Sequence, residues 1–154
     1  MSRVSESTII LCGGPLNHSN LPIGTNQSNA MVPINGKPVI GWILDELLFK
    51  GIRHATVVLR EQNTRLRAFI ERAYANRMDI HVAPLSEEGT IIQSIRAGLA
   101  RTASGAGVVR VILGDTLIRD SFADDRDFVY TGESKIRAAG ASPSQVTSAK
   151  SLTS

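Results

Sequence analysis

Two short pairs of residues, Gly13-Gly14 and Gly114-Asp115, each come directly after a run of apolar residues. Runs of this kind suit strands that are buried on both faces of a parallel sheet. Ligands of such sheets bind beyond the carboxyl ends of the strands, which is where both pairs fall. Glycine lets backbone N–H groups approach a phosphate, and hard cations take carboxylate oxygens as ligands. The two pairs therefore mark the expected ligand site.

Alternating strand and helix patterns must position this site. Apolar or β-branched runs predict four strands at residues 8–12, 55–59, 79–83 and 108–113, with a fifth at 128–130. Between them, apolar residues recur at helical spacing in three segments that begin near residues 39, 64 and 90. Strands that alternate with helices imply βαβ units. We therefore predict an α/β fold with three layers around a mainly parallel sheet.

Each predicted helix has a boundary residue and an apolar stripe. Pro38 fits the first turn of the first helix, and Gly51 fits its carboxyl-terminal cap. Asn63 or Thr64 caps the second helix, and Thr90 opens the third. The stripe of the second helix comprises Leu66, Phe69, Ile70, Ala73 and Tyr74, and that of the third comprises Ile91, Ile92, Ile95 and Leu99.

The composition excludes several classes of protein. With 154 residues, 42% hydrophobic and 20% charged, the chain suits one packed domain rather than global disorder. Of its net charge of +3, residues 132–154 supply +2, from three cations and one acid, so we expect no nucleic-acid face. No apolar run approaches the roughly 20 residues of a spanning helix, and no secretory signal is apparent. We expect no membrane insertion and a cytoplasmic location.

The end of the chain differs in character from the rest. Residues 132–154 are rich in serine and other small residues and lack apolar periodicity, which predicts a disordered tail after a domain of residues 1–131. Cys12 is the single cysteine, so no intrachain disulfide can form. We expect Cys12 to be a small buried core residue.

Four motifs occur in an order that resembles one enzyme family. They are Leu11-Cys12-Gly13-Gly14, Pro33-Ile34-Asn35-Gly36-Lys37-Pro38, Gly89-Thr90-Ile91 and Gly114-Asp115, within residues 8–120. In this order and spacing, the set resembles the sugar-nucleotide pyrophosphorylase family, also called the NTP-transferase or nucleotidyltransferase family. The resemblance implies a nucleotide-diphospho-sugar transferase-like, Rossmann-like fold.

The resemblance also implies an activity and the residues that perform it. The family transfers a nucleotidyl group from an NTP to a sugar-1-phosphate, as in activated-sugar synthesis for surface polysaccharide. The residues implied in nucleotide binding are Leu11, Gly13, Gly14, Gly89 and Thr90. Lys37 is implied as the catalytic contact with phosphate, and Asp115 as the ligand of Mg²⁺. The implied partners are thus an NTP and a sugar-1-phosphate, with Mg²⁺ as cofactor, and the oligomeric state is left open.

The sequence departs from the family pattern at two cationic positions. Where the family has an arginine in its glycine loop, this chain has His18, which is mostly neutral at pH 7 when unperturbed. Where the family has a Pro-Lys pair, this chain has Ser28-Asn29. The reaction depends on positioned positive charge, so both losses should reduce catalysis heavily. Family domains are also usually longer, and we expect a truncated domain.

Three interpretations of function stay open: a nucleotidyltransferase, a catalytically impaired relative that binds nucleotide or a partner, and a non-functional fragment. Each candidate residue also has a local structural alternative. These are a tight turn at Gly13-Gly14, a helix cap at Thr90, a turn-capping carboxylate at Asp115 and solvation of a helix start by Lys37. The contacts that each side chain makes distinguish these alternatives.

Overall fold

The computed structural model describes residues 6–14, 28–85, 90–102 and 108–117, all of which belong to one compact unit of residues 1–120. His18, Gly89, the expected strand at 128–130 and the expected tail at 132–154 lie outside the described residues, as does the expected domain boundary. In the parts that are described, no helix has the length and apolar character needed to cross a membrane.

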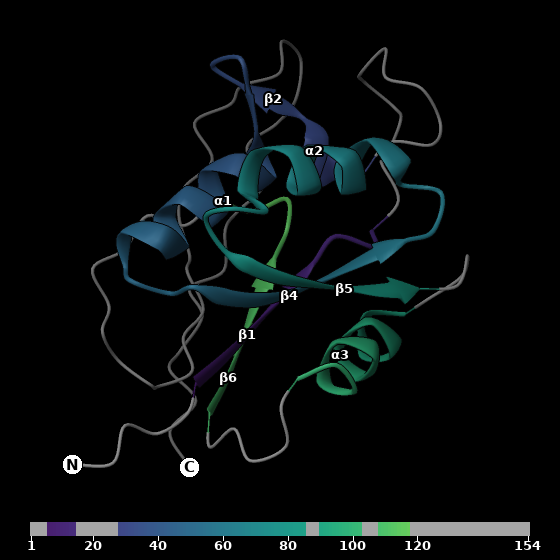
Figure 1. The fold of residues 1–154 in the computed structure, drawn as a ribbon. Coiled ribbons are helices and arrows are strands. Elements are labelled where there is room, and N and C mark those ends of the chain that lie inside the picture. Colours follow the sequence, from purple (N-terminus) through teal and green to yellow (C-terminus); the bar gives the residue numbers. More distant parts are fainter. Residues whose placement is uncertain (1–5, 15–27, 86–89, 103–107, 118–154) are drawn as a thin grey trace, which may run out of the picture. The chain divides into compact units, whose positions relative to one another are not determined.

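Four parallel strands form the central sheet (Figure 1). They are β1 (Glu6–Leu11), β4 (His54–Arg60), β5 (Asp79–Leu85) and β6 (Val108–Leu113), in the spatial order β5-β4-β1-β6. The expected mainly parallel sheet is confirmed, with strand ends that differ from the expected ones by at most two residues. The strands form because their β-branched side chains are buried on both faces of the sheet, Ile10 on one and Val58 on the other.

Helices cover both faces of the sheet, as Figure 1 shows. α1 (Val39–Phe49) and α2 (Thr64–Tyr74) pack on the face that presents Ile10 and Val57. α3 (Ile91–Leu99) packs on the opposite face, which presents Ile9 and Val58. Because alternate residues of a strand point to opposite faces, β1 and β4 each contribute to both cores. The expected three-layer arrangement is confirmed.

A two-stranded hairpin, unexpected from the sequence, precedes α1. Its strands, β2 (Pro33–Ile34) and β3 (Lys37–Pro38), are antiparallel and follow a short 3₁₀ turn, η2 (Asn29–Met31). The connecting residues Asn35 and Gly36 both have positive φ, at 50° and 76°. A type I′ turn requires such angles at both positions, and Asn-Gly is its strongest sequence signal.

The carboxyl end of α1 is the one expected from Gly51. This glycine has a φ of 80°, and its N–H donates to the Leu48 carbonyl at 3.0 Å. The Ile52 N–H donates to the Leu47 carbonyl at 2.9 Å. Together these bonds form a Schellman motif, in which glycine adopts the left-handed conformation. At the other end, Pro38 is the N-cap residue and not part of the first turn.

The buried stripe of α2 agrees with expectation except at Ala73. Leu66, Ile70 and Tyr74 are buried, whereas Ala73 lies to one side of their line and is exposed. Asn63 is the N-cap residue, but its side chain makes no capping bond. It instead accepts a hydrogen bond from the backbone of Arg60.

The expected stripe of α3 is wrong at three of its four members. Ile91, Ile92 and Leu99 are 58%, 63% and 43% exposed. The residues that face the sheet are Ser94 and Gly98, both buried. A Cβ built on Gly98 would lie 2.5 Å from Cγ2 of Ile9, so the helix packs too closely for large side chains there. Small residues therefore face the sheet at the closest contacts, Ile95 packs beside them against the core, and Ile91 and Ile92 turn outward.

Candidate functional site at the strand ends

The two predicted pairs of residues lie side by side at the carboxyl ends of β1 and β6. The Gly114 N–H donates to the Leu11 carbonyl at 2.8 Å. A Cβ built on Gly114 would lie 2.4 Å from Sγ of Cys12 and 2.9 Å from the Leu11 carbonyl oxygen, closer than a side chain tolerates. Glycine is therefore required at position 114, and this close approach brings Asp115 beside the backbone that follows β1.

Gly13 and Gly14 have different surroundings. A Cβ on Gly13 would lie 2.8 Å from the flexible end of Leu85, whereas one on Gly14 would meet nothing within 4 Å. Neither glycine has a positive φ, so the backbone here does not need glycine for its conformation. The tight-turn alternative therefore does not explain Gly14, which is exposed at the strand end.

Asp115 is exposed and hydrogen-bonded to two side chains. Asn29 Nδ2 donates to its Oδ2 at 3.3 Å, and the Thr116 hydroxyl donates to its Oδ1 at 3.1 Å. Asn29 is held nearby because the preceding Ser28 hydroxyl donates to the Cys12 carbonyl at 2.9 Å. A turn-capping carboxylate would accept backbone N–H groups, but the partners of Asp115 among the described residues are side chains.

Arg60 enters the site from β4, which lies on the other side of β1 from β6. Its Nε–H donates to the Gly13 carbonyl at 2.7 Å, and its side chain is half-buried. No sequence motif singled out this residue, because one charged residue after an apolar run is an ordinary strand terminus. Its place at the carboxyl end of a predicted strand was the available signal. We call Gly13, Gly14, Asn29, Arg60 and Asp115 the strand-end group.

The amino end of α3 lies close to Gly13. The Thr90 hydroxyl accepts the Gln93 N–H at 3.3 Å, and the Thr90 N–H donates to the Gln93 side chain at 2.7 Å, which forms a capping box. Ser94 Oγ would lie 3.7 Å from a Cβ on Gly13. The structure thus shows the helix-cap alternative for Thr90, and its contact with a nucleotide stays a prediction.

Cys12 lies buried beneath the strand-end group. Burial, with a smaller contribution from the negative charge of Asp115, raises the pKa of the Cys12 thiol to about 12. A thiol with this pKa is protonated at neutral pH and is a poor nucleophile. The expected buried core residue is confirmed, at 3% exposure.

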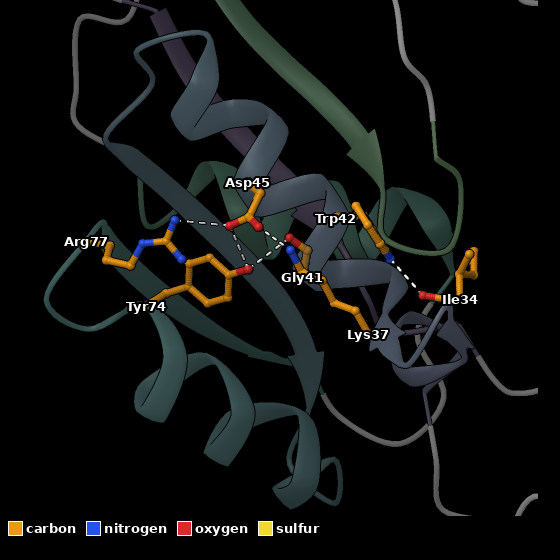
Figure 2. Close-up of polar contacts among 7 residues, drawn as sticks. All are labelled: Ile34, Lys37, Gly41, Trp42, Asp45, Tyr74 and Arg77. Carbon is orange, nitrogen blue, oxygen red and sulfur yellow. Dashed lines mark hydrogen bonds and ion pairs between the residues drawn. The ribbon is translucent and has the colours of Figure 1, made fainter.

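Lys37 makes its contacts outside the strand-end group, in a polar network on α1 and α2 (Figure 2). Its ammonium group forms an ion pair with Asp45 and lies 4.6 Å from the centre of the Trp42 ring. The Trp42 indole N–H also donates to the Ile34 carbonyl at 3.0 Å. These contacts fix the β2–β3 hairpin to α1, so Lys37 does more than solvate the start of a helix, and its contact with phosphate stays a prediction.

Asp45 is the centre of this network. The Tyr74 hydroxyl donates to its Oδ1 at 3.0 Å, and Arg77 lies 3.3 Å from the same oxygen (Figure 2). Burial acts to raise the pKa of Asp45, but hydrogen bonds from Lys37 and Tyr74, with the charges of Lys37 and Arg77, outweigh it and lower that pKa. Burial and the neighbouring Asp45 carboxylate raise the pKa of Tyr74. Asp45 is therefore ionised when it holds the hairpin.

The carboxylate at the strand ends suits a metal ion that is also bound by the phosphates of a nucleotide. Among residues whose positions are described, no three His, Cys, Asp or Glu side chains are grouped so that they could hold a metal by themselves. Mg²⁺ is usually bound through one or two carboxylates together with substrate phosphates. Asp115, which is exposed and close to Gly13-Gly14, matches that pattern.

A hollow of about 530 Å³ lies at the opposite end of the strands, near the amino ends of β4 and β5. Its lining includes Arg53, His54 and Asp79, and none of the strand-end group. Ligands of parallel sheets bind at the carboxyl ends of the strands. We therefore place the candidate site at the strand-end group and not in this hollow.

Solved structures match the chain, although no protein-family model and no curated protein matches it. A putative glucose-1-phosphate thymidylyltransferase from Bacillus anthracis, solved with a sucrose, has a TM-score of 0.60 and 22% identity, over 79% of this chain and 47% of its own. A UDP-glucose pyrophosphorylase complexed with UDP-glucose has a TM-score of 0.58 and 19% identity, over 73% of this chain and 46% of its own. Rv0371c from Mycobacterium tuberculosis H37Rv has a TM-score of 0.54 and 23% identity, over 75% of this chain and 54% of its own.

Rv0371c has also been solved in complex with manganese. The present chain spans about half of the length of each of these proteins. At such identities the likeness is one of fold, and it covers about three quarters of this chain.

Proposed function

We propose that this chain, which has the fold of sugar-nucleotide pyrophosphorylases and other nucleotidyltransferases, binds an NTP with Mg²⁺ at the strand-end group and transfers the nucleotidyl group to a sugar-1-phosphate. The product class would be an activated sugar of the kind used for surface polysaccharide, made in the cytoplasm. Two features support the proposal, namely the shared fold and the chemistry of the strand-end group.

One observation carries the proposal: the close approach of Gly114 to Leu11 brings Gly13-Gly14 and Asp115 together. Backbone N–H groups suit phosphate oxygens, and a carboxylate suits the metal ion that accompanies those phosphates. Gly14 adds support, because it has open space around it and no conformational need for glycine. Because glycine has no side chain, Gly14 leaves space at the strand end through which a ligand can approach.

In the proposed reaction, an oxygen of the sugar phosphate attacks the α-phosphorus of the NTP, and pyrophosphate leaves. A divalent metal, when bound, would neutralise charge on the phosphate oxygens, and the manganese complex of Rv0371c supports such a metal. The residues of this chain act by positioning. Gly13 and Gly14 would present backbone N–H groups, the Leu11 carbonyl holds Gly114 at the end of β6, and Asp115 would hold the metal.

The proposed roles of Lys37, Gly89 and Thr90 carry conditions. Lys37 can contact phosphate only if its ion pair with Asp45 opens or rearranges. Thr90 is exposed, so a base or ribose can contact it while the capping box stays intact. Gly89, next to it in the chain, is proposed to contact the same part of the nucleotide.

Asn29 favours a second candidate function, nucleotide binding without turnover. It stands where the resemblance places a lysine of the family, and its amide lies 3.3 Å from the Asp115 carboxylate. A neutral amide supplies no positive charge to a leaving pyrophosphate. In this case the chain would bind Mg–NTP and release no pyrophosphate.

Isothermal titration calorimetry with each Mg–NTP tests the proposal. We expect the wild type to bind an NTP, and Asp115→Asn to bind it more than tenfold more weakly, a loss of about 1.4 kcal/mol or more. Asp79→Asn makes the same chemical change at the amino end of β5 and should bind as the wild type does. A pyrophosphate-release assay with sugar-1-phosphates then separates turnover from binding alone.

Two results would count against the proposal. Equal affinities in Asp115→Asn and Asp79→Asn would remove Asp115 from the site. A folded wild type that binds no NTP would refute the proposed function as a whole.

A further inference from the structure

Arg60 is a cation of the strand-end group that the roles proposed above do not use. It ends β4, and β4 and β6 are the two neighbours of β1. Arg60, which is positively charged, and Asp115, which is negatively charged, therefore lie on the two sides of Gly13-Gly14. A complex of Mg²⁺ and phosphate complements this arrangement, because the metal suits the carboxylate and the phosphate oxygens suit the guanidinium.

Three hydrogen bonds fix Arg60 in place. Its backbone N–H donates to Asn63 Oδ1 at 3.2 Å, and its carbonyl accepts the Asn63 N–H at 2.9 Å. Its Nε–H donates to the Gly13 carbonyl at 2.7 Å. The side chain is half-buried, so it has lost part of its freedom and hydration before any ligand arrives. Such preorganisation lowers the entropic cost of binding.

Among the described residues, the side chain of Arg60 bonds only to the Gly13 carbonyl. Nε–H is one of the five N–H donors of a guanidinium, and the remaining donors have no partner within the described ranges. Their planar fork matches two oxygens of a phosphate group. Arg60 alternates with Leu59 along β4 and so shares the sheet face of Val58, which packs against α3. The guanidinium therefore lies on the side where α3 begins.

We propose that Arg60 is a phosphate-binding residue, whose guanidinium donates to the phosphate oxygens of the NTP. It supplies positive charge that the chain lacks at His18 and Asn29, the two positions where the family pattern has cations. The inference rests on the proposed function and adds to it a residue that none of the sequence motifs contains. The competing role is purely structural, in which the Nε bond only holds the Gly13 carbonyl.

Titrations with ligands that differ in their phosphates separate these two roles. The ligands are Mg–NTP, inorganic tripolyphosphate with Mg²⁺, and the matching nucleoside, whose weak binding is followed by NMR. Loss of hydrogen bonds to a charged group corresponds to roughly 10- to 100-fold in affinity. We expect Arg60→Gln to lose this much affinity for both phosphate-bearing ligands and none for the nucleoside.

Arg72→Gln is the matched control, because it removes the same charge from an exposed position in the last turn of α2. It should bind all three ligands as the wild type does. If Arg60→Gln and Arg72→Gln bind Mg–NTP equally well, the inference is overturned while the proposed function stands. If Arg60→Gln loses as much affinity for the nucleoside as for Mg–NTP, the inference is also overturned, because that result indicates a purely structural role for Arg60. A wild type that binds no Mg–NTP overturns both.

Chemical modification tests the inference without any variant. Phenylglyoxal reacts with accessible arginines, and peptide mass spectrometry reports the extent of reaction at each one. We expect saturating Mg–NTP to slow the modification of Arg60 several-fold and to leave that of Arg72 unchanged. Equal modification of Arg60 with and without Mg–NTP overturns the inference.

Discussion

Replacing Gly114 with alanine would disturb the contact on which the strand-end group depends. The new methyl group would lie 2.4 Å from Sγ of Cys12 and 2.9 Å from the carbonyl oxygen of Leu11. The sulfur is buried and the oxygen belongs to the backbone of an interior strand, so neither can move unless β1 or β6 shifts. We expect the hydrogen bond from the Gly114 N–H to Leu11, now 2.8 Å, to lengthen or break.

The magnitude follows from these two effects. Overpacking of this kind costs about 1–3 kcal/mol, and the loss of one hydrogen bond costs about 1 kcal/mol more. Gly114→Ala should therefore lower the free energy of unfolding by about 2–4 kcal/mol, a large part of the roughly 5–15 kcal/mol of an ordinary domain. Urea denaturation followed by circular dichroism measures this change.

Gly14→Ala is the control for this experiment. A Cβ at position 14 would meet nothing within 4 Å, and the backbone there has no positive φ. Its free energy of unfolding should stay within about 1 kcal/mol of the wild type, while its affinity for Mg–NTP should fall because the methyl group narrows the approach to the loop. If Gly114→Ala is as stable as Gly14→Ala, the close contact of Gly114 with Leu11 and Cys12 is refuted.

Three further predictions concern pH and the face of α3. Because its pKa is lowered in the folded state, Asp45 stabilises the protein above its ordinary pKa of 3.8, and this stability is lost as the pH falls through the folded pKa. In Asp45→Asn, the free energy of unfolding should therefore decrease less steeply below about pH 5 than it does in the wild type. An equal pH dependence in the two proteins would contradict this. Since the pKa of Cys12 is raised from 9.0 to about 12, stability should fall as the pH rises between these values, and this part of the fall should be absent in Cys12→Ala. Ile92→Lys should change the free energy of unfolding by less than about 0.5 kcal/mol, whereas Gly98→Ala, with its Cβ 2.5 Å from Ile9, should lower it by about 1–3 kcal/mol. The opposite ranking in urea denaturation would mean that α3 buries the stripe expected from the sequence.

The sheet and its helices could be predicted because their signals are local and repeated along the chain. Residues 108–113 form an apolar run, and the structure has a strand with the same ends. Gly51 predicted the end of α1, and its left-handed conformation confirms the reason. The pairs Gly13-Gly14 and Gly114-Asp115 predicted a ligand site at two strand ends, and the hydrogen bond between Gly114 and Leu11 shows that the two pairs lie side by side. The resemblance built on these motifs is confirmed for the fold.

The remaining features depend on tertiary contacts that spacing does not record. Ile91 and Ile92 fit a helical stripe as well as Ser94 and Gly98 do, and only the distance to Ile9 decides which of them is buried. This is why the helix was predicted correctly and its buried face was not.

Two charged residues illustrate the same limit at the candidate site. Asp45, the partner of Lys37, lies eight residues further along the chain and on another element, so no motif predicts the pair. Arg60 joins the strand-end group only because β4 lies next to β1 in the sheet. The roles of Lys37 and Thr90 toward a nucleotide stay predictions, as does the identity of the metal as Mg²⁺.

The hydrogen bond between Asn29 and Asp115 joins side chains that are 86 residues apart in sequence. β1 and β6 are the first and last strands within the described residues, so the site cannot form during synthesis until both have left the ribosome. Contacts of such long sequence separation are slow to form in folding. A nucleotide that bridges Gly13 and Asp115 would therefore bind only molecules in which β1 and β6 have already paired. The bound nucleotide would also stabilise the pairing of β1 and β6, because any ligand that binds only the folded state opposes the separation of these two strands.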